Sequence, residues 1–128
     1  MQYRESLPSD CPPPNAHGIM AGTVRYRLLE TSAPRQEDFD SYAKRQGAVN
    51  RQISRTPCEQ SGVSLFVSQE SARKLMTSPL NRNRRWQAVG ELTLPAGAGK
   101  LSPVDSNEHQ TWWPSQAFDP VRNCTVLS

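Results

Sequence analysis

Long hydrophobic runs are missing from this 128-residue chain, in which hydrophobic residues make up 35% of the sequence and the mean hydropathy is -0.70. A helix that crosses a membrane needs about 20 consecutive apolar residues, and no segment approaches that length. A recognisable signal peptide is also missing. We therefore expect a soluble protein of the cytoplasm that has no membrane partner.

Cysteine and histidine are scarce. The cysteines Cys11, Cys58 and Cys124 are far apart and form no C-x-x-C pair, and the histidines His17 and His109 lie in polar surroundings. Structural zinc sites need short, regular spacings of these residues, so no metal is expected. A histidine-based catalytic triad has few possible members. The odd number of cysteines favours reduced thiols, with one disulfide and one free thiol as the alternative.

Well-known catalytic motifs are missing as well. The sequence contains no G-x-S-x-G, H-E-x-x-H, EF-hand or G-x-G-x-x-G pattern. The glycine-containing segment 95–100 is not a phosphate-binding P-loop, because Lys100 is followed by Leu101 where serine or threonine is required. No residue pattern is therefore diagnostic of a hydrolase or of a nucleotide-binding enzyme.

The composition that is present fits one small domain. A mass of 14.3 kDa is ordinary for a single domain. The 15 basic and 12 acidic residues leave a net charge of +3, which indicates a mixed, solvated surface more than a binding site for polyanions. Four of the 11 prolines fall within residues 1–17. We expect a proline-rich surface arm over 1–17 and a single domain over 18–128.

The clearest structural signal is the stretch 61–76. Its β-favouring apolar run over 63–67 predicts a strand. Ser68 then predicts the beginning of a helix, because its side chain can accept a hydrogen bond from a free backbone N–H group. The helix carries an apolar stripe formed by Ala72, Leu75 and Met76. Strand and helix should therefore pack on one core.

Hydrophobic alternation and turn residues predict the remaining elements. Besides the strand over 63–67 and the helix after it, strands are expected over 22–29, 86–94, 101–104, 108–114 and 123–127, and a second helix over 36–45. This order lacks the regular alternation of a doubly wound parallel sheet. We expect an α+β fold with a mixed or antiparallel sheet and two main helices.

Two adjacent tryptophans stand out in the strand predicted over 108–114. Adjacent side chains of a strand point to opposite faces, so one indole can belong to the core while the other is exposed. Trp113 lies on the same side as His109 and is a candidate stacking surface for a ligand, and either Trp112 or Trp113 is a candidate anchor for a protein partner. In the alternative interpretation both indoles pack inside and His109 is a rim residue.

Arginines are concentrated in two places. Arg82, Arg84 and Arg85 lie within four residues, and Arg25 and Arg27 share one face of a predicted strand. If the two groups form one continuous basic surface, they predict binding to nucleic acid. A solvated turn is the commoner role of such residues, so nucleic acid is the third choice of partner.

Three segments follow one another in a suggestive order: Arg27 in an early strand, residues 62–68 leading into a helix, and Glu91 in a later strand. This order resembles the ADP-ribosyltransferase-like superfamily, including its small bacterial toxin branches. The resemblance implies an enzyme that binds NAD as a substrate and transfers ADP-ribose. It implies that Arg27 contacts NAD, that Ser64 or Ser68 lines the nicotinamide pocket, and that Glu91 is the catalytic carboxylate.

These roles require the named side chains to lie close together in the folded protein. An anionic dinucleotide favours an arginine fork and a developing cation favours a carboxylate, so Arg27, Glu91 and one of the serines must converge in one cleft. The alternative is a non-catalytic protein-interaction module of a toxin, defence or secretion system, which docks on its partner through exposed aromatic residues.

Overall fold

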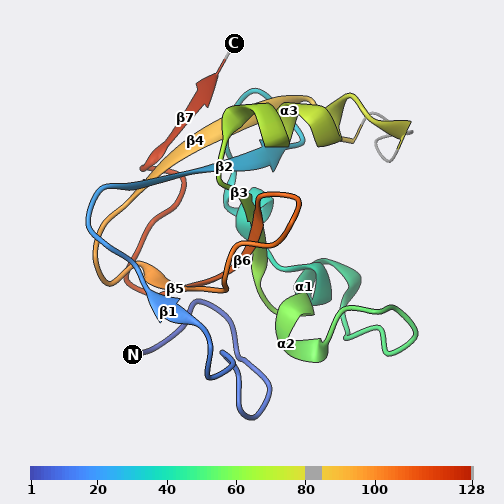
Figure 1. Cartoon of the computed structure of the whole chain (residues 1–128), viewed down its shortest axis with the longest axis vertical. Helices are drawn as coiled ribbons and strands as arrows, with labels where there is room; N and C mark the ends of the chain where they lie inside the picture. Colours follow the sequence, from blue (N-terminus) through green and yellow to red (C-terminus); the bar gives the residue numbers. More distant parts are fainter. Residues whose placement is uncertain (80–84, 128) are drawn as a thin grey trace.

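A seven-stranded sheet organises the molecule (Figure 1). The computed structural model describes residues 1–79 and 85–127. The strands are β1 (His17–Gly18), β2 (Thr23–Leu29), β3 (Val63–Phe66), β4 (Ala88–Leu94), β5 (Gly99–Leu101), β6 (His109–Pro114) and β7 (Cys124–Leu127). They lie in the order β1-β5-β6-β3-β2-β4-β7, and each of these pairs is antiparallel. A small single-domain α+β fold is thereby confirmed.

Each face of the sheet carries a hydrophobic core, which explains why the alternation of side chains predicts the strands well. The larger core includes Leu29, Leu65, Leu92, Leu94 and Trp112. The smaller core lies on the other face, under helix α3 (Gln69–Met76), and includes Leu28, Phe66, Ala72 and Val89. Full burial of one such aliphatic side chain stabilises the fold by roughly 1.5 to 3 kcal/mol.

Helix α3 begins where the sequence predicts. The Ser68 side chain accepts a hydrogen bond of 3.1 Å from the backbone N–H of Ser71, which satisfies one free donor of the first turn. Ala72 is fully buried, and Leu75 and Met76 pack against the smaller core. The apolar stripe therefore attaches α3 to the sheet.

The single helix expected over 36–45 is not formed. The chain makes a 3-10 turn, η1 (Gln36–Phe39), becomes extended at Asp40, and then forms the short helix α1 (Tyr42–Gln46). Ser41 caps α1, and the Glu5 carboxylate accepts hydrogen bonds from both the backbone N–H and the hydroxyl of Ser41, at 2.8 and 2.6 Å. This contact holds Ser41 outside the helix, so the helical content is divided among shorter elements than predicted.

The arm over 1–17 follows the surface and is fastened at several points. Tyr3 forms an isolated bridge with Ser115, and a disulfide joins Cys11 to Cys58 in helix α2 (Pro57–Gln60). This single turn lies in the segment 48–60, for which the sequence indicates a loop or a loop with one helical turn. Cys124 is a free thiol. The cysteines thus adopt the alternative arrangement in place of the three reduced thiols that the odd number favours. None of the described helices is long and apolar enough to cross a membrane.

Strands β2 and β3 form the narrowest junction of the sheet. Among the described residues they share one residue pair, Tyr26 with Phe66, whereas β2 and β4 share seven. Beyond that pair, the Arg27 guanidinium donates to the backbone carbonyl of Ser64 at 3.1 Å. A side chain therefore supplies a hydrogen bond at the point where the two strands separate.

Candidate functional site

The ladder between β3 and β6 brings Ser64 and His109 together. Ser64 is paired with Thr111 and Phe66 with His109, so Ser64 and His109 are diagonal neighbours on one face of the sheet. The Nε2 atom of His109 lies 3.0 Å from the Oγ atom of Ser64. Two residues to which the sequence analysis assigned separate roles therefore form one hydrogen-bonded pair.

Asp105 completes this arrangement from the turn before β6. Its Oδ2 atom lies 3.3 Å from the Nδ1 atom of His109. Its Oδ1 atom accepts hydrogen bonds from the backbone N–H groups of Asn107 and His109, at 2.8 and 3.0 Å. The turn thus fixes the carboxylate beside the imidazole. Asp105 was not among the predicted site residues, and its only signal in the sequence is an aspartate four positions before a histidine.

Burial lowers the pKa of His109 below its ordinary value of 6.5, although Asp105 acts in the opposite direction. The imidazole is therefore neutral at neutral pH, with Nδ1–H donating to Asp105 and Nε2 accepting from the Ser64 hydroxyl. Partial burial raises the pKa of Asp105, but the backbone hydrogen bonds outweigh it and the pKa is lowered. We call Ser64, His109 and Asp105 the triad.

A groove of about 700 Å³ opens between α3 and the turn 105–108, and its lining includes His109 and Asp105 but not Ser64, which lies behind His109. The ring of Phe66 meets the His109 ring edge-on, with 5.6 Å between the ring centroids. Helix α3 contributes Glu70, Ser71, Lys74 and Leu75 to the lining. The groove therefore combines an apolar floor with charged side chains, and His109 and Asp105 reach it directly.

Arg27 is buried and engaged within the protein. It is 3% exposed, and its Nε atom donates to the backbone carbonyl of Asp38 at 3.0 Å while Nη1 donates to that of Ser64. Burial, and then repulsion from Arg45, lower its pKa to about 9. Arg27 thus supports the strand that carries Ser64, and its guanidinium is not displayed to a ligand as the resemblance implies.

Glu91 lies on the opposite face of the sheet from the Arg27 side chain. The register pairs Tyr26 with Glu91 and Arg27 with Gly90, and adjacent residues of a strand point to opposite faces. The Tyr26 hydroxyl donates to the Glu91 carboxylate at 3.3 Å, which confirms that these two share a face. The structure does not bring Arg27 and Glu91 into one cleft.

The two candidate serines have different surroundings. Ser68 caps α3, its Oγ atom lies 2.8 Å from that of Ser71, and it donates to the Glu108 carboxylate at 3.4 Å. Ser64 lies inside β3, and its Oγ atom contacts His109. Of the two serines, Ser64 is therefore the one that joins a potential base.

Both tryptophans are buried, as in the interpretation in which both indoles pack inside and His109 is a rim residue, and neither indole forms the exposed surface of the other interpretation. Trp112 and Trp113 are 0% and 1% exposed. Trp112 enters the larger core and donates to the Ala98 carbonyl at 3.1 Å. On the other face, α2 approaches Trp113, whose Nε1 atom donates to the Cys58 carbonyl at 3.0 Å. His109 alone of the three predicted surface residues stays partly exposed.

The predicted basic surface is only partly within the described residues, because Arg82 and Arg84 lie outside them. Arg25 donates to the side chain of Gln110 at 2.6 Å. Arg85 lies in a different cluster, near Trp86. The described arginines therefore do not demonstrate a continuous surface for nucleic acid.

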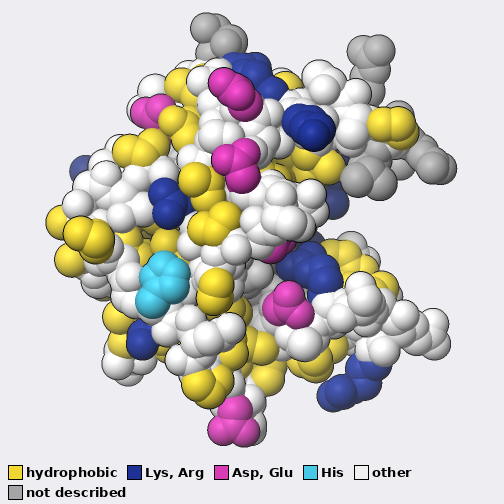
Figure 2. Space-filling view, viewed as in Figure 1, with side chains coloured by type: hydrophobic (Ala, Val, Ile, Leu, Met, Phe, Trp, Pro, Cys, Tyr) yellow, Lys and Arg dark blue, Asp and Glu magenta, His cyan; other side chains and the backbone are white. Residues whose placement is uncertain are grey.

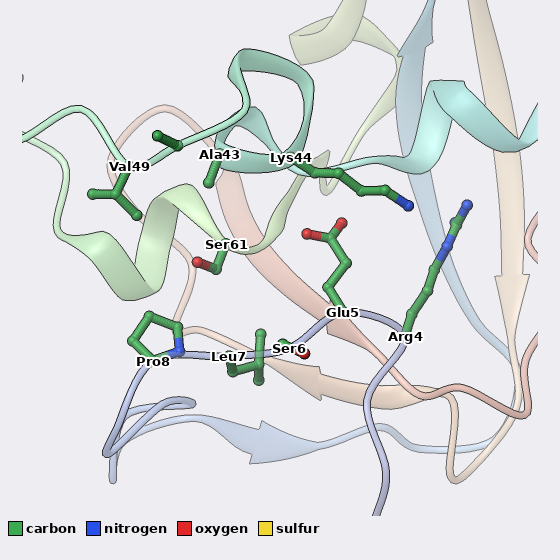
Figure 3. Close-up of a pocket in the computed structure, with 10 residues that line it drawn as sticks. Arg4, Glu5, Ser6, Leu7, Pro8, Ala43, Lys44, Val49 and Ser61 are labelled. Carbon is green, nitrogen blue, oxygen red and sulfur yellow. The ribbon is translucent and has the colours of Figure 1, made fainter.

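A second cavity, of about 560 Å³, lies between the N-terminal arm and α1 (Figure 3). Its charged groups have partners within the protein: Glu5 accepts from Ser41, and Lys44 and Arg4 contact Asp40 at 3.3 and 3.6 Å. These pairs fasten the arm to the domain. We therefore interpret this cavity as a packing seam.

Among residues 1–79 and 85–127, no group of three or more His, Cys, Asp or Glu side chains is arranged to hold a metal ion. Comparisons of the chain with protein-family models, with curated proteins and with solved structures find no match. The function is therefore inferred from the chain's own geometry, in which the triad and its groove are the most complete chemical arrangement.

Proposed function

We propose that this protein is a hydrolase that transfers an acyl group from an ester, thioester or amide to water through Ser64. The observation that carries the proposal is the chain of contacts from Ser64 through His109 to Asp105, the last two of which line a groove large enough for a small substrate. A nucleophile, a base and a group that orients the base are the parts that serine-based acyl transfer requires.

In the first half of the reaction, the Oγ atom of Ser64 bonds to the acyl carbon and its proton passes to Nε2 of His109. His109 gives this proton to the leaving group as the bond to the acyl carbon breaks, which leaves an ester on Ser64. Water then attacks this ester and passes a proton to His109. The proton returns to Ser64 as the acid departs, while Asp105 favours each transient imidazolium.

The local electrostatics favour these roles. A neutral His109 whose Nδ1–H faces Asp105 presents Nε2 as a proton acceptor. Arg55 lowers the pKa of His109 as well, and Glu59 raises it. The site thus contains a base and the group that orients it.

The test combines labelling by a fluorophosphonate probe with hydrolysis of short-chain p-nitrophenyl esters. The probe should modify Ser64 in the folded wild-type protein and leave Ser64→Ala unlabelled. His109→Gln should lower kcat at least about 100-fold, since the base is lost. Ser32→Ala is the matched control, because Ser32 is an exposed serine outside the triad. Melting temperatures confirm that each variant is folded.

Two results would overturn the proposal. One is a folded wild-type protein that is neither labelled nor active on any ester. The other is ester turnover that Ser64→Ala retains in full, because the activity would then arise elsewhere.

The resemblance to ADP-ribosyltransferases is a separate hypothesis with its own test. It needs Arg27 and Glu91 to act on one NAD molecule, whereas these side chains leave the sheet on opposite faces. Melting temperatures at millimolar NAD can compare the wild type with Glu91→Ala. A rise that is lost in the variant would favour the transferase hypothesis over the hydrolase.

A further inference from the structure

Three arginines surround one indole near the end of β2. The guanidinium carbons of Arg27, Arg45 and Arg85 lie 5.7, 5.8 and 4.4 Å from the ring centroid of Trp86. We call these four residues the arginine–indole cluster. Cation–π attraction holds each guanidinium near the ring, but three like charges also repel one another. The arrangement therefore needs negative charge nearby.

The protein supplies little of that charge. Glu30 lies 3.2 Å from Arg85, 3.9 Å from Arg45 and 3.7 Å from Arg35, so one carboxylate is shared among three guanidinium groups. The carboxylate of Asp38 is 3.3 Å from Arg35 and also acts on Arg27, and Asp40 acts on Arg45. Asp40 is itself shared with Lys44 and Arg4, so positive charge remains in excess around Trp86.

Arg45 also lacks hydrogen-bond acceptors. Its Nε and Nη1 atoms are buried and have no hydrogen-bond partner in the described part of the chain. A buried guanidinium donor without an acceptor is costly, and such groups normally find one. The Arg45 and Arg85 side chains nevertheless remain 20% and 41% exposed, so a ligand can approach them from solvent. Because the Nε and Nη1 atoms of Arg45 are themselves out of reach of solvent, an external anion meets the exposed parts of the Arg45 and Arg85 side chains and offsets their charge.

We propose that the arginine–indole cluster binds the phosphate group of a small phosphate ester or of pyrophosphate. Phosphate oxygens match the planar donor forks of Arg45 and Arg85, and the charge of the group offsets the local excess. Arg27 remains buried behind Arg45 and Arg85 and contributes only its positive charge, and the Trp86 ring forms one apolar side of the site. Figure 2 shows that the surface is hollowed between α3 and the α1–α2 region, with basic and acidic side chains at the margin.

A small phosphate ligand fits better than a nucleic acid. Nucleic-acid backbones are held by basic stripes that contact several successive phosphates. Here two partly exposed guanidinium groups converge on one ring, which suits a single phosphate group. This inference is independent of the hydrolase proposal, because its measurements need no turnover.

The test is a titration with pyrophosphate in which binding is measured by tryptophan fluorescence and by melting temperature. A parallel titration with sodium chloride at equal ionic strength is the control. Saturable binding is expected in the wild type. Arg45→Gln and Arg85→Gln should each weaken binding about tenfold or more, because each removes a charged donor fork. Arg122→Gln is the charge-matched control, since Arg122 is exposed near β7, and its affinity should stay within about twofold of wild type.

The variant Trp86→Phe tests whether the fluorescence change on binding pyrophosphate comes from Trp86. Because the other two tryptophans are buried in the cores, the fluorescence change should disappear in this variant while the shift in melting temperature persists. The proposal is overturned if pyrophosphate acts no differently from chloride, or if Arg122→Gln weakens binding as much as Arg45→Gln. Binding of a short oligonucleotide more than about tenfold tighter than pyrophosphate would also overturn it, in favour of nucleic acid.

Discussion

The Nδ1 atom of His109 lies 3.3 Å from the ionised Asp105 carboxylate, yet at neutral pH the imidazole is uncharged, so the contact is a hydrogen bond to a carboxylate and not an ion pair. Burial of the imidazole outweighs the attraction of the carboxylate, so the pKa of His109 is lowered. The same contact that orients the base in the proposed reaction therefore leaves it unprotonated, as a general base must be.

This shift predicts a pH dependence of stability. Because the folded pKa of His109 is below the unfolded value of about 6.5, the unfolded chain binds more protons in the window between them. The contribution of His109 is therefore complete above that value and is lost as the pH falls toward the folded pKa. The difference in melting temperature between wild type and His109→Gln should shrink over this window. His17→Gln, at an exposed histidine, should follow the wild type.

The disulfide predicts a large effect of reduction. Cys11 and Cys58 are 47 residues apart, and closing a loop of that size stabilises a fold by up to about 4 kcal/mol in the chain-entropy treatment. Replacing both by serine should lower the melting temperature by on the order of 10 °C. Cys124→Ser is the control and should change it far less. Unchanged stability on reduction of the wild type would contradict the pairing.

Cys124 should react slowly with alkylating reagents. Burial, and then the charge of Asp38, raise its pKa to about 11. At pH 8 its thiolate fraction is then lower than that of an ordinary thiol by about two orders of magnitude. Iodoacetamide labelling should be correspondingly slow in the folded protein and fast in guanidinium chloride. Equal rates in the two states would show that the thiol is not shielded.

Gly99 should not tolerate a side chain. It has a φ of 128°, and an added Cβ would overlap the carbonyl oxygen of Trp113 across the β5–β6 ladder. Because the obstacle is backbone, Gly99→Ala should destabilise the fold by more than about 2 kcal/mol. Gly18, in the neighbouring strand β1, has open space around it. Gly18→Ala should change the unfolding free energy by less than about 0.5 kcal/mol in the same urea titration.

Local sequence was a good guide to strands and a poor one to short helices. Strands β2 and β4 each alternate between two covered faces, so their patterns carry the information. The segment 36–45 has helix-favouring charges, but Glu5 binds Ser41 from 36 positions away and interrupts the helix. The strand expected over 101–104 ends at Leu101. There the Ser102 hydroxyl accepts the Thr111 N–H at 2.7 Å, and Pro103 has no N–H to continue the ladder.

The sequence indicates two of the three triad residues individually, but it does not indicate that they lie together. The sequence indicates Ser64 and His109 as separate candidates, but their contact depends on the β3–β6 register between residues 45 positions apart. The burial of Trp113 depends on α2, which the disulfide holds near the arm. For Arg27 the sequence predicts a ligand contact that the structure does not show. An arginine in an alternating strand gives no sign that its side chain will be buried at the junction between two strands.

The single residue pair between β2 and β3 leaves few backbone hydrogen bonds at the centre of the sheet. On one side, β1-β5-β6-β3 carries the triad, and on the other, β2-β4-β7 lies next to the arginine–indole cluster. Both hydrophobic cores contain residues from the two sides, so side-chain packing, together with the Arg27 hydrogen bond to Ser64, holds the sheet together here. Backbone amides at this junction should therefore exchange with deuterium faster than those of the fully paired β2–β4 ladder.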